Sequence, residues 1–251
     1  MMTGIANWRD VGARAENGIA PGRVFRSGHL ANATAADLVE LEQIGLATIL
    51  DLRRPHERAA SPTPALSPGV TILTSDLGDA TEPPHVAFLR QAVVTPASVD
   101  AYLVDYYTHA AFLPRHIALF QAMFAALLDR DGAMLVHCAA GKDRTGLAIA
   151  LLQSALGVPR AAILAEYALS NAALARPDAL DAARVHLCRV LGQTPPDFAI
   201  AAFLGVSAHH LAAAFDGIEQ RRGSVEAYLA DLGVGARETA ALRIALQDRP
   251  S

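Results

Sequence analysis

The chain has 251 residues, of which 52% are hydrophobic and 18% charged, a composition that excludes a disordered protein and allows a sizeable core. The net charge of −4 argues against a broad cationic surface for nucleic acid. Two cysteines, Cys138 and Cys188, are too few for a disulfide scaffold or a zinc site. No signal-like N-terminus and no apolar run of about 18 residues stands out, so we expect no integral membrane segment. The cytoplasm is the default location, with export without a signal peptide left open.

The first half of the chain predicts strands that alternate with helices. Thr34 is a suitable N-cap for a helix that stops near Gly45. A proline-rich stretch, 55–68, predicts a loop. Residues 85–129 have a helical pattern interrupted near Thr95 and Pro114, and we consider residues 85–112 a candidate lid. Short extended or apolar runs predict strands at 7–12, 24–28, 47–52 and 70–73.

The second half begins with one more apolar run, 133–136, and continues as helices. We expect helices over 145–156, about 159–175 and 178–191, followed by a helical elaboration over 197–251. Strands that alternate with helices, followed by an all-helical end, indicate an α/β fold. Because no Gly/Ser-rich linker marks a boundary, we expect a single domain over 1–251.

A cysteine lies between the run 133–136 and the next helix, in a segment that we call the cysteine loop (residues 137–146). Backbone amides and the helix dipole at such a place favour a thiolate and can also bind phosphate. Arg144, six residues after Cys138, offers a guanidinium fork suited to phosphate oxygens. The joint spacing of Cys, Gly and Arg has a chance of about 0.01 in this composition. The loop therefore predicts a phosphatase that acts through a phosphocysteine.

The string His137-Cys138-x-x-Gly141-x-x-Arg144-Thr145-Gly146 resembles the signature of the cysteine-dependent protein tyrosine phosphatase superfamily. Its fuller form, Gly-Lys-Asp-Arg-Thr-Gly, is similar to the bacterial branch with tyrosine, serine/threonine and phosphoinositide phosphatase activity. Further stretches match that branch: 7–12, 26–28, 51–53, 166–171 and 223–229. The first of them usually continues with a second glycine, and Ala13 stands there instead. The resemblance implies an α/β fold with a central, mostly parallel sheet flanked by helices. It also implies a phosphorylated protein or a phosphoinositide as substrate, an oxyanion in the loop, and no metal or cofactor.

The cysteine loop supplies most of the expected site. Cys138 is the expected nucleophile, and Arg144 is expected to bind two phosphoryl oxygens and stabilise their charge. Thr145 can donate its hydroxyl to the thiolate or simply cap the helix, and His137 can orient the loop or serve as a core histidine. The residues expected to bind phosphate are Ala139, Ala140, Gly141, Lys142, Asp143, Arg144 and Thr145.

The proton donor to the leaving oxygen stays open between two aspartates. Asp143 lies in the loop, and the related bacterial enzymes make it a candidate. Asp76, with Asp79 beside it, follows a predicted strand and resembles the mobile acid loop of other superfamily members. Lys142, the single lysine of the chain, is either an extra positive charge for a substrate with several phosphates or a solvated lysine.

Polar residues beside the predicted strands are expected to form buried ion pairs at the base of the loop. Two other functions are kept as alternatives. A rhodanese-like sulfurtransferase also uses a cysteine loop before a helix, although that loop is typically one residue shorter. A phosphate-binding module without turnover would not need Cys138 beside Arg144. The residues expected at the base are Arg9, Asp10, Arg26, Asp51 and Arg53.

Overall fold

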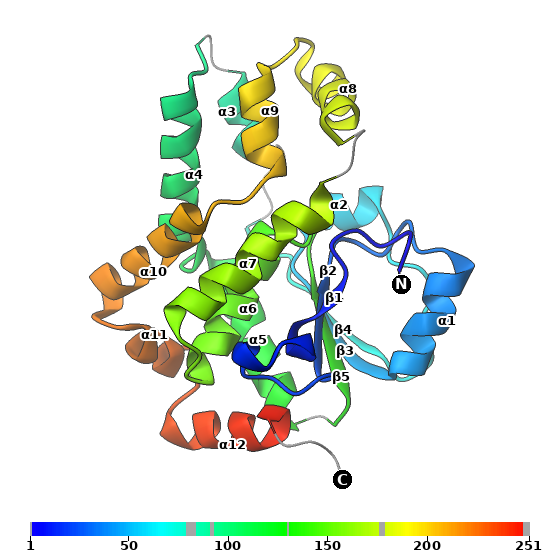
Figure 1. Ribbon diagram of the computed structural model, residues 1–251, viewed down its shortest axis with the longest axis vertical. Coiled ribbons are helices and arrows are strands. Elements are labelled where there is room, and N and C mark those ends of the chain that lie inside the picture. The colour runs from blue at the N-terminus through cyan, green and yellow to red at the C-terminus, as the bar shows by residue number, and fades with distance from the viewer. Residues whose placement is uncertain (1, 79–83, 91–92, 130, 176–178, 248–251) are drawn as a thin grey trace.

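The computed structural model describes residues 2–78, 84–90, 93–129, 131–175 and 179–247 (Figure 1). Its centre is a five-stranded sheet in the order β1-β2-β5-β3-β4. All neighbouring strands pair in parallel except β1 and β2, so the predicted α/β fold with a mostly parallel sheet is confirmed. The strands are β1 (Arg9–Asp10), β2 (Val24–Ser27), β3 (Leu46–Asp51), β4 (Thr71–Leu73) and β5 (Ala133–His137).

Strand β5 lies in the middle of the sheet, and all five of its residues are buried. Met134 and Val136 belong to the larger hydrophobic core, whereas Ala133 and Leu135 belong to a second core. Because successive side chains of a strand point to opposite faces, β5 supplies both cores. Figure 1 shows α1 on one side of the sheet and α5 and α6 on the other. A strand covered in this way needs the unbroken apolar run that the sequence provides.

Most of the described chain outside the sheet is helical, and the predicted helical C-terminal part is confirmed. Two short 3-10 turns, η1 (Val11–Ala13) and η2 (Ala15–Asn17), follow β1. Within the described residues, no single helix combines the length and apolar composition needed to cross a membrane. The helices are α1 (Ala35–Ile44), α2 (Pro55–Ala60), α3 (Pro84–Leu89), α4 (Pro96–Ala110), α5 (Pro114–Asp129), α6 (Asp143–Ala155), α7 (Arg160–Leu174), α8 (Ala179–Leu191), α9 (Asp197–Leu204), α10 (Ala208–Arg222), α11 (Val225–Asp231) and α12 (Ala236–Gln247).

Helix α1 begins and ends where the sequence predicts. The Thr34 side chain accepts from the backbone N–H of Asp37, and the Asp37 carboxylate accepts from the N–H of Thr34, which completes a capping box. At the other end Gly45 has φ 69°, a left-handed conformation that favours glycine. The Asp37 carboxylate also accepts from the N–H groups of Thr3 and Gly4, which fastens the N-terminal segment to α1.

The prediction that the whole proline-rich stretch 55–68 is a loop is wrong at its start, where α2 spans Pro55–Ala60. Proline is tolerated in the first turn of a helix because its missing N–H would have no partner there. Glu57 then accepts from the backbone N–H of Arg54. A prediction that treats every proline as a helix-ending residue does not find this helix.

Helices α3, α4, α8 and α9 share a third, smaller hydrophobic cluster, at the top of Figure 1. Phe88 of α3 stacks on Tyr102 of α4 with ring centroids 4.6 Å apart, and Phe203 of α9 meets Tyr102 edge to face. Helices α3 and α4 of the candidate lid, 85–112, therefore pack against α8 and α9. That it moves as a lid stays a prediction.

We predict that Asp37→Asn lowers the free energy of unfolding at pH 7 by about 1–3 kcal/mol, because a buried carboxylate loses hydrogen bonds. Burial acts to raise the pKa of Asp37, but the hydrogen bonds from Thr34, Thr3 and Gly4 outweigh it and lower the pKa from 3.8 to about 2. A lowered pKa stabilises the fold above the unfolded value, and this contribution disappears as the pH falls through the folded value. Urea unfolding should therefore show a difference from the wild type that shrinks between pH 4 and pH 2. The exposed Asp216→Asn is the control, and equal differences at both pH values would contradict the account.

Candidate active site

Cys138 directly follows β5, and the loop that it begins leads into α6 at Asp143. Its side chain is buried, with 2% of the residue exposed, beneath the end of a strand and beside a helix N-terminus. Parallel strands β2 and β3 flank β5, so their C-terminal ends meet the loop at the same edge of the sheet. This edge is where open α/β sheets bind ligands.

The carbonyl groups of the cysteine loop are held from outside the loop. Asn7 donates its side-chain amide to the carbonyl oxygens of Ala140 at 3.2 Å and Gly141 at 2.8 Å. Arg26 donates to the Gly141 oxygen at 2.7 Å, and the backbone N–H of His29 donates to the Ala139 oxygen at 3.1 Å. Because a peptide's N–H points opposite to its C=O, carbonyls held from behind turn the following amides toward the inside of the loop.

Buried ion pairs support these donors, as the sequence predicts. Glu166 of α7 bonds Arg26 at 2.6 Å and Arg9 at 2.8 Å. Burial acts to raise the pKa of Glu166, yet the two arginines lower it on balance, so the carboxylate stays charged. The expectation is wrong for Asp10, because its carboxylate accepts from the backbone N–H groups of Gly12 and Gly22.

Gly141 is required by both conformation and space. Its φ is 69°, in the left-handed region, and a Cβ there would lie 2.2 Å from the backbone carbonyl of Ser27. Only glycine adopts this conformation freely and lets the loop approach β2 so closely. The sequence predicts this role for Gly141.

Arg144 lies in the first turn of α6 and is clamped by a carboxylate of α2. Its Nη1 and Nη2 donate to the two oxygens of Glu57 at 2.6 and 2.7 Å, and Nη1 also donates to the Leu52 carbonyl at 3.1 Å. Burial acts to raise the pKa of Glu57, but Arg144 outweighs it and lowers the pKa to about 2. Within the described residues, this arrangement leaves the Nε–H and one Nη2–H of Arg144 for another acceptor.

The two candidate proton donors lie in different places. Asp143 lines the same pocket as Cys138, and its Oδ1 accepts from the Tyr107 hydroxyl at 2.5 Å. Asp76 follows β4, has a side chain that is 79% exposed, pairs with Arg58 and does not line the pocket. Asp79 lies outside the described residues. The structure thus brings Asp143, and not Asp76, beside Cys138.

Lys142 lines the pocket but directs its ammonium group to the end of α9. Nζ donates to the carbonyl oxygens of Phe203 and Gly205, the latter at 2.9 Å, and lies 3.3 Å from Oδ2 of Asp143. The residue is buried, so it is not the solvated lysine of the alternative interpretation. Its charge faces helix-end carbonyls, which it stabilises.

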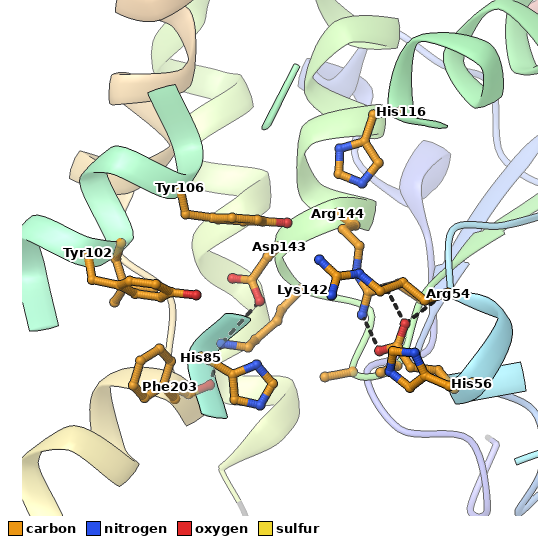
Figure 2. A pocket seen from close by; sticks show the side chains of 15 residues that line it. Arg54, His56, His85, Tyr102, Tyr106, His116, Lys142, Asp143, Arg144 and Phe203 are labelled. Carbon is orange, nitrogen blue, oxygen red and sulfur yellow. Dashed lines mark hydrogen bonds and ion pairs between the residues drawn. The ribbon is translucent and has the colours of Figure 1, made fainter. Parts of the chain in front are cut away.

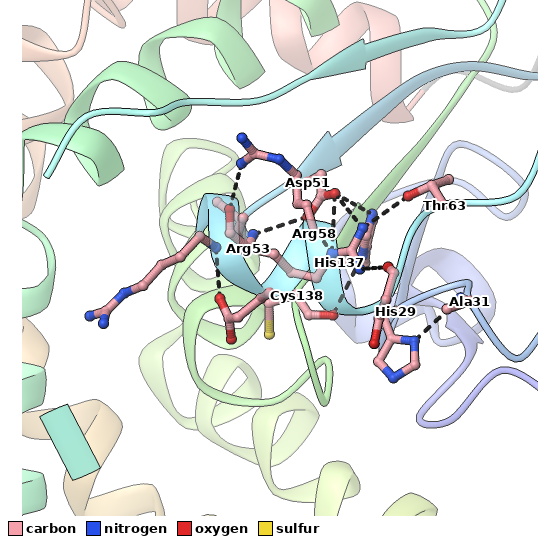
Figure 3. A network of polar contacts seen from close by, with 12 residues as sticks. His29, Ala31, Asp51, Arg53, Arg58, Thr63, His137 and Cys138 are labelled. Carbon is pink, nitrogen blue, oxygen red and sulfur yellow. Dashed lines mark hydrogen bonds and ion pairs between the residues drawn. The ribbon is translucent and has the colours of Figure 1, made fainter. Parts of the chain in front are cut away.

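His137 and Thr145 are both fully buried. The Nδ1 of His137 lies 3.4 Å from the Cys138 carbonyl oxygen, and Nε2 lies 3.7 Å from Asp51 (Figure 3). Burial lowers the pKa of His137 to about 4, so its ring is neutral at pH 7. Asp51 pairs with Arg53 at 2.7 Å, one of the expected ion pairs. The Thr145 hydroxyl is buried and has no hydrogen-bond partner within the described residues.

Aromatic rings form the wall of the pocket opposite Arg144. Tyr102 and Tyr106, one turn apart on α4, both project toward Asp143 and Arg144 in Figure 2. Phe203 of α9 and His85 of α3 continue this wall. No group of three His, Cys, Asp or Glu side chains among the described residues could hold a metal ion. The pocket is lined by Arg54, His56, Glu57, His85, Tyr102, Leu103, Tyr106, His116, Cys138, Ala139, Ala140, Lys142, Asp143, Arg144 and Phe203.

Sequence reasoning missed the roles of several residues in this arrangement. Asn7 and Glu166 fall in stretches that carry the resemblance, but without a fold nothing connects them to the loop. Glu57 lies in the stretch expected to be a loop, where a proline followed two residues later by Glu was the available signal for a helix start. Tyr107 is one of three clustered tyrosines, and nothing in the surrounding sequence distinguishes it from Tyr102 and Tyr106.

Comparison with known proteins agrees with the geometry. A family model described as the tyrosine phosphatase family matches residues 1–248. A putative tyrosine-protein phosphatase of Cupriavidus necator is 35% identical over 230 residues, which cover 90% of this chain and 81% of that protein. The triple specificity protein phosphatase PtpB of Mycobacterium tuberculosis is 28% identical over 267 residues, covering 93% of each chain. Because the family model covers nearly the whole chain and the Cupriavidus necator relative is 35% identical, the chain belongs to the tyrosine phosphatase family as a protein-tyrosine-phosphatase-type enzyme.

Proposed function

We propose that the protein hydrolyses phosphomonoesters through a phosphocysteine at Cys138. The thiolate attacks phosphorus, an S–P bond forms, and the ester P–O bond breaks. Asp143 gives its proton to the leaving oxygen. Water then attacks the phosphorus and gives a proton to the Asp143 carboxylate, and the S–P bond breaks to release phosphate and the thiolate. Arg144 and the amides of the cysteine loop stabilise the charge on the phosphoryl oxygens throughout.

One observation carries this proposal: the carbonyls of Ala139, Ala140 and Gly141 are all bonded from outside the loop. The amides that follow them are thereby available to three phosphoryl oxygens above Cys138. The Thr145 hydroxyl, buried without a partner within the described residues, supports a role as donor to the cysteine sulfur as the phosphocysteine breaks down.

Family membership argues against the two alternatives. Both alternatives would also bind an anion beside a helix N-terminus: a rhodanese-like sulfurtransferase, and a phosphate-binding module without turnover. The matched family and the named relatives are phosphatases.

The proposed substrate is phosphotyrosine, with phosphoserine, phosphothreonine or phosphoinositides as further substrates. The rings of Tyr102, Tyr106 and Phe203 support an aryl phosphate, because offset and edge-to-face ring contacts are favourable. Lys142 gives little support to a substrate with several phosphates, because its ammonium is already bonded to two carbonyls. A location in the cytoplasm, with export left open, stays a prediction.

We predict that Cys138→Ser abolishes turnover of p-nitrophenyl phosphate, because a serine hydroxyl in this loop is not ionised. The matched control is Cys188→Ser, since Cys188 lies on α8 outside the pocket. Orthovanadate should inhibit the wild type and a chelator should not. Full activity of Cys138→Ser, or strict dependence of the wild-type activity on added Mg²⁺, would contradict the proposal.

The proton donor is tested by comparing Asp143→Asn with Asp76→Asn. We expect Asp143→Asn to lower kcat by about 10²- to 10⁴-fold with an alkyl phosphate and to remove the basic limb of its pH–rate profile. With a good leaving group the loss should be small, since no proton is needed. Asp76→Asn should behave as the wild type. The reverse pattern would assign the acid to Asp76.

The role of the hydrogen bonds that hold the loop carbonyls from outside is tested with Asn7→Ala. Removing both bonds to the loop carbonyls should lower kcat/KM about tenfold or more and weaken inhibition by inorganic phosphate, because the amides are no longer preorganised. Asn17→Ala is the control, because the buried Asn17 side-chain amide also donates to a backbone carbonyl, that of Val11 at 2.8 Å, and neither residue lines the pocket. Unchanged phosphate inhibition in Asn7→Ala would contradict this role.

A further inference from the structure

Two buried tyrosine hydroxyls lie behind Asp143. The hydroxyl of Tyr107 is 2.5 Å from Oδ1 of Asp143 and 2.5 Å from the hydroxyl of Tyr167. Each tyrosine is only 1% exposed, so neither hydroxyl has bulk water as a partner. Asp143 itself reaches the pocket, with 29% of its side chain exposed.

Three helices bring this chain of hydroxyls together. Tyr107 belongs to α4 and Tyr167 to α7, while Asp143 is the first residue of α6. Gly146, one turn into α6, makes the approach possible, because a Cβ there would lie 2.6 Å from the Tyr167 ring. The family signature ends at this glycine, so one small residue of the cysteine loop also admits the second tyrosine.

The direction of the hydrogen bonds follows from proton counting. Tyr107 has one hydroxyl proton, which it donates to the Asp143 oxygen, and its own oxygen then accepts from Tyr167. Burial and the Asp143 charge raise the pKa of both tyrosines, so both remain donors over the working pH range. The order is Tyr167 to Tyr107 to Oδ1 of Asp143.

We infer that Tyr107, backed by Tyr167, is a positioning residue that holds Oδ1 of Asp143 and so fixes the rotation of the carboxyl group that donates the proton. The inference rests on the proposed function, in which Asp143 is the acid. With Oδ1 fixed, the carboxyl group cannot rotate freely, and its second oxygen stays directed away from the tyrosines. A preoriented acid transfers its proton without a reorientation step.

A purely structural role would not need a carboxyl partner. Tyr228 shows what a structural buried tyrosine does in this fold, since its hydroxyl donates to the backbone carbonyl of Ala111 at 2.5 Å. Other charged or titratable groups also surround the pair. They are Lys142 at 3.3 Å from Oδ2, Tyr102 and Tyr106 on α4, Arg26 near Tyr167, and His210 of α10, which stacks on Tyr107 and bonds Asp100 of α4.

The test is Tyr107→Phe, which removes the hydroxyl and keeps the ring. Loss of a donor to the carboxylate disfavours the ionised acid, so the basic limb of the kcat/KM profile should move up by about half to one pH unit. The kcat with phenyl phosphate should fall about tenfold, whereas with p-nitrophenyl phosphate, a better leaving group, it should fall less than about twofold. Tyr167→Phe should cause a smaller shift in the same direction, and it carries the test if Tyr107→Phe does not fold. Tyr228→Phe is the matched control for loss of a buried hydroxyl.

An unshifted basic limb, or an equal loss with both substrates, would overturn the inference. Assays of Asp143→Asn and Cys138→Ser separate this failure from failure of the proposed function. If Asp143→Asn keeps the basic limb, or Cys138→Ser keeps full activity, the proposed mechanism is wrong and the inference falls with it. If both behave as predicted and only Tyr107→Phe is unchanged, the mechanism stands and the positioning role does not.

Discussion

The hydrogen bonds that hold the loop carbonyls from outside are the constraint on which the rest of the site depends. The amides of a flexible loop do not converge on one point by themselves. Without the outside hydrogen bonds, the anion would have to order them as it binds, at a cost in conformational entropy. Here Asn7 and Arg26 bond the carbonyls of residues 140 and 141, and Glu166 forms an ion pair with the buried Arg26. Since a buried charge without a partner is costly, the ion pair and the loop shape stabilise each other. The N-terminal segment and α7, far apart in sequence, thereby set the geometry above Cys138.

Charged side chains around the pocket are likewise held by partners from other elements. Arg144 is fixed by Glu57 from α2, and Lys142 is fixed by carbonyls at the end of α9. Arg144 and Lys142 therefore each have a partner from a different element, and these elements converge at the C-terminal edge of the parallel sheet. Tyr102 and Phe203 of the aromatic wall pack against the third hydrophobic cluster, whereas Tyr106 packs against the larger core.

The sequence was informative where chemistry is local. The run Ala133–Val136, the Thr34 cap, Gly45 and the spacing of Cys138, Gly141 and Arg144 each express a short-range rule, and the elements appeared where those rules put them. Contacts across long separations were not readable. Asn7 meets Gly141 across 134 positions, and Tyr107 meets Tyr167 across 60, and no periodicity encodes either contact. The helix at Pro55 is also local, but proline both ends helices and begins them, so a proline-rich composition alone does not distinguish α2 from a loop. Asp76 looked equivalent to Asp143 until the fold separated them.

Direct detection of the covalent intermediate tests the central claim, that this preorganised loop serves nucleophilic attack by one thiolate. Rapid acid quenching during turnover of p-nitrophenyl phosphate, followed by peptide mass spectrometry, locates any phosphate bound to the protein. The account predicts phosphate on the peptide that contains Cys138, and none on that peptide in Cys138→Ser. Phosphate on another residue, or turnover with an initial burst of nitrophenol and no phosphate on Cys138, would contradict it.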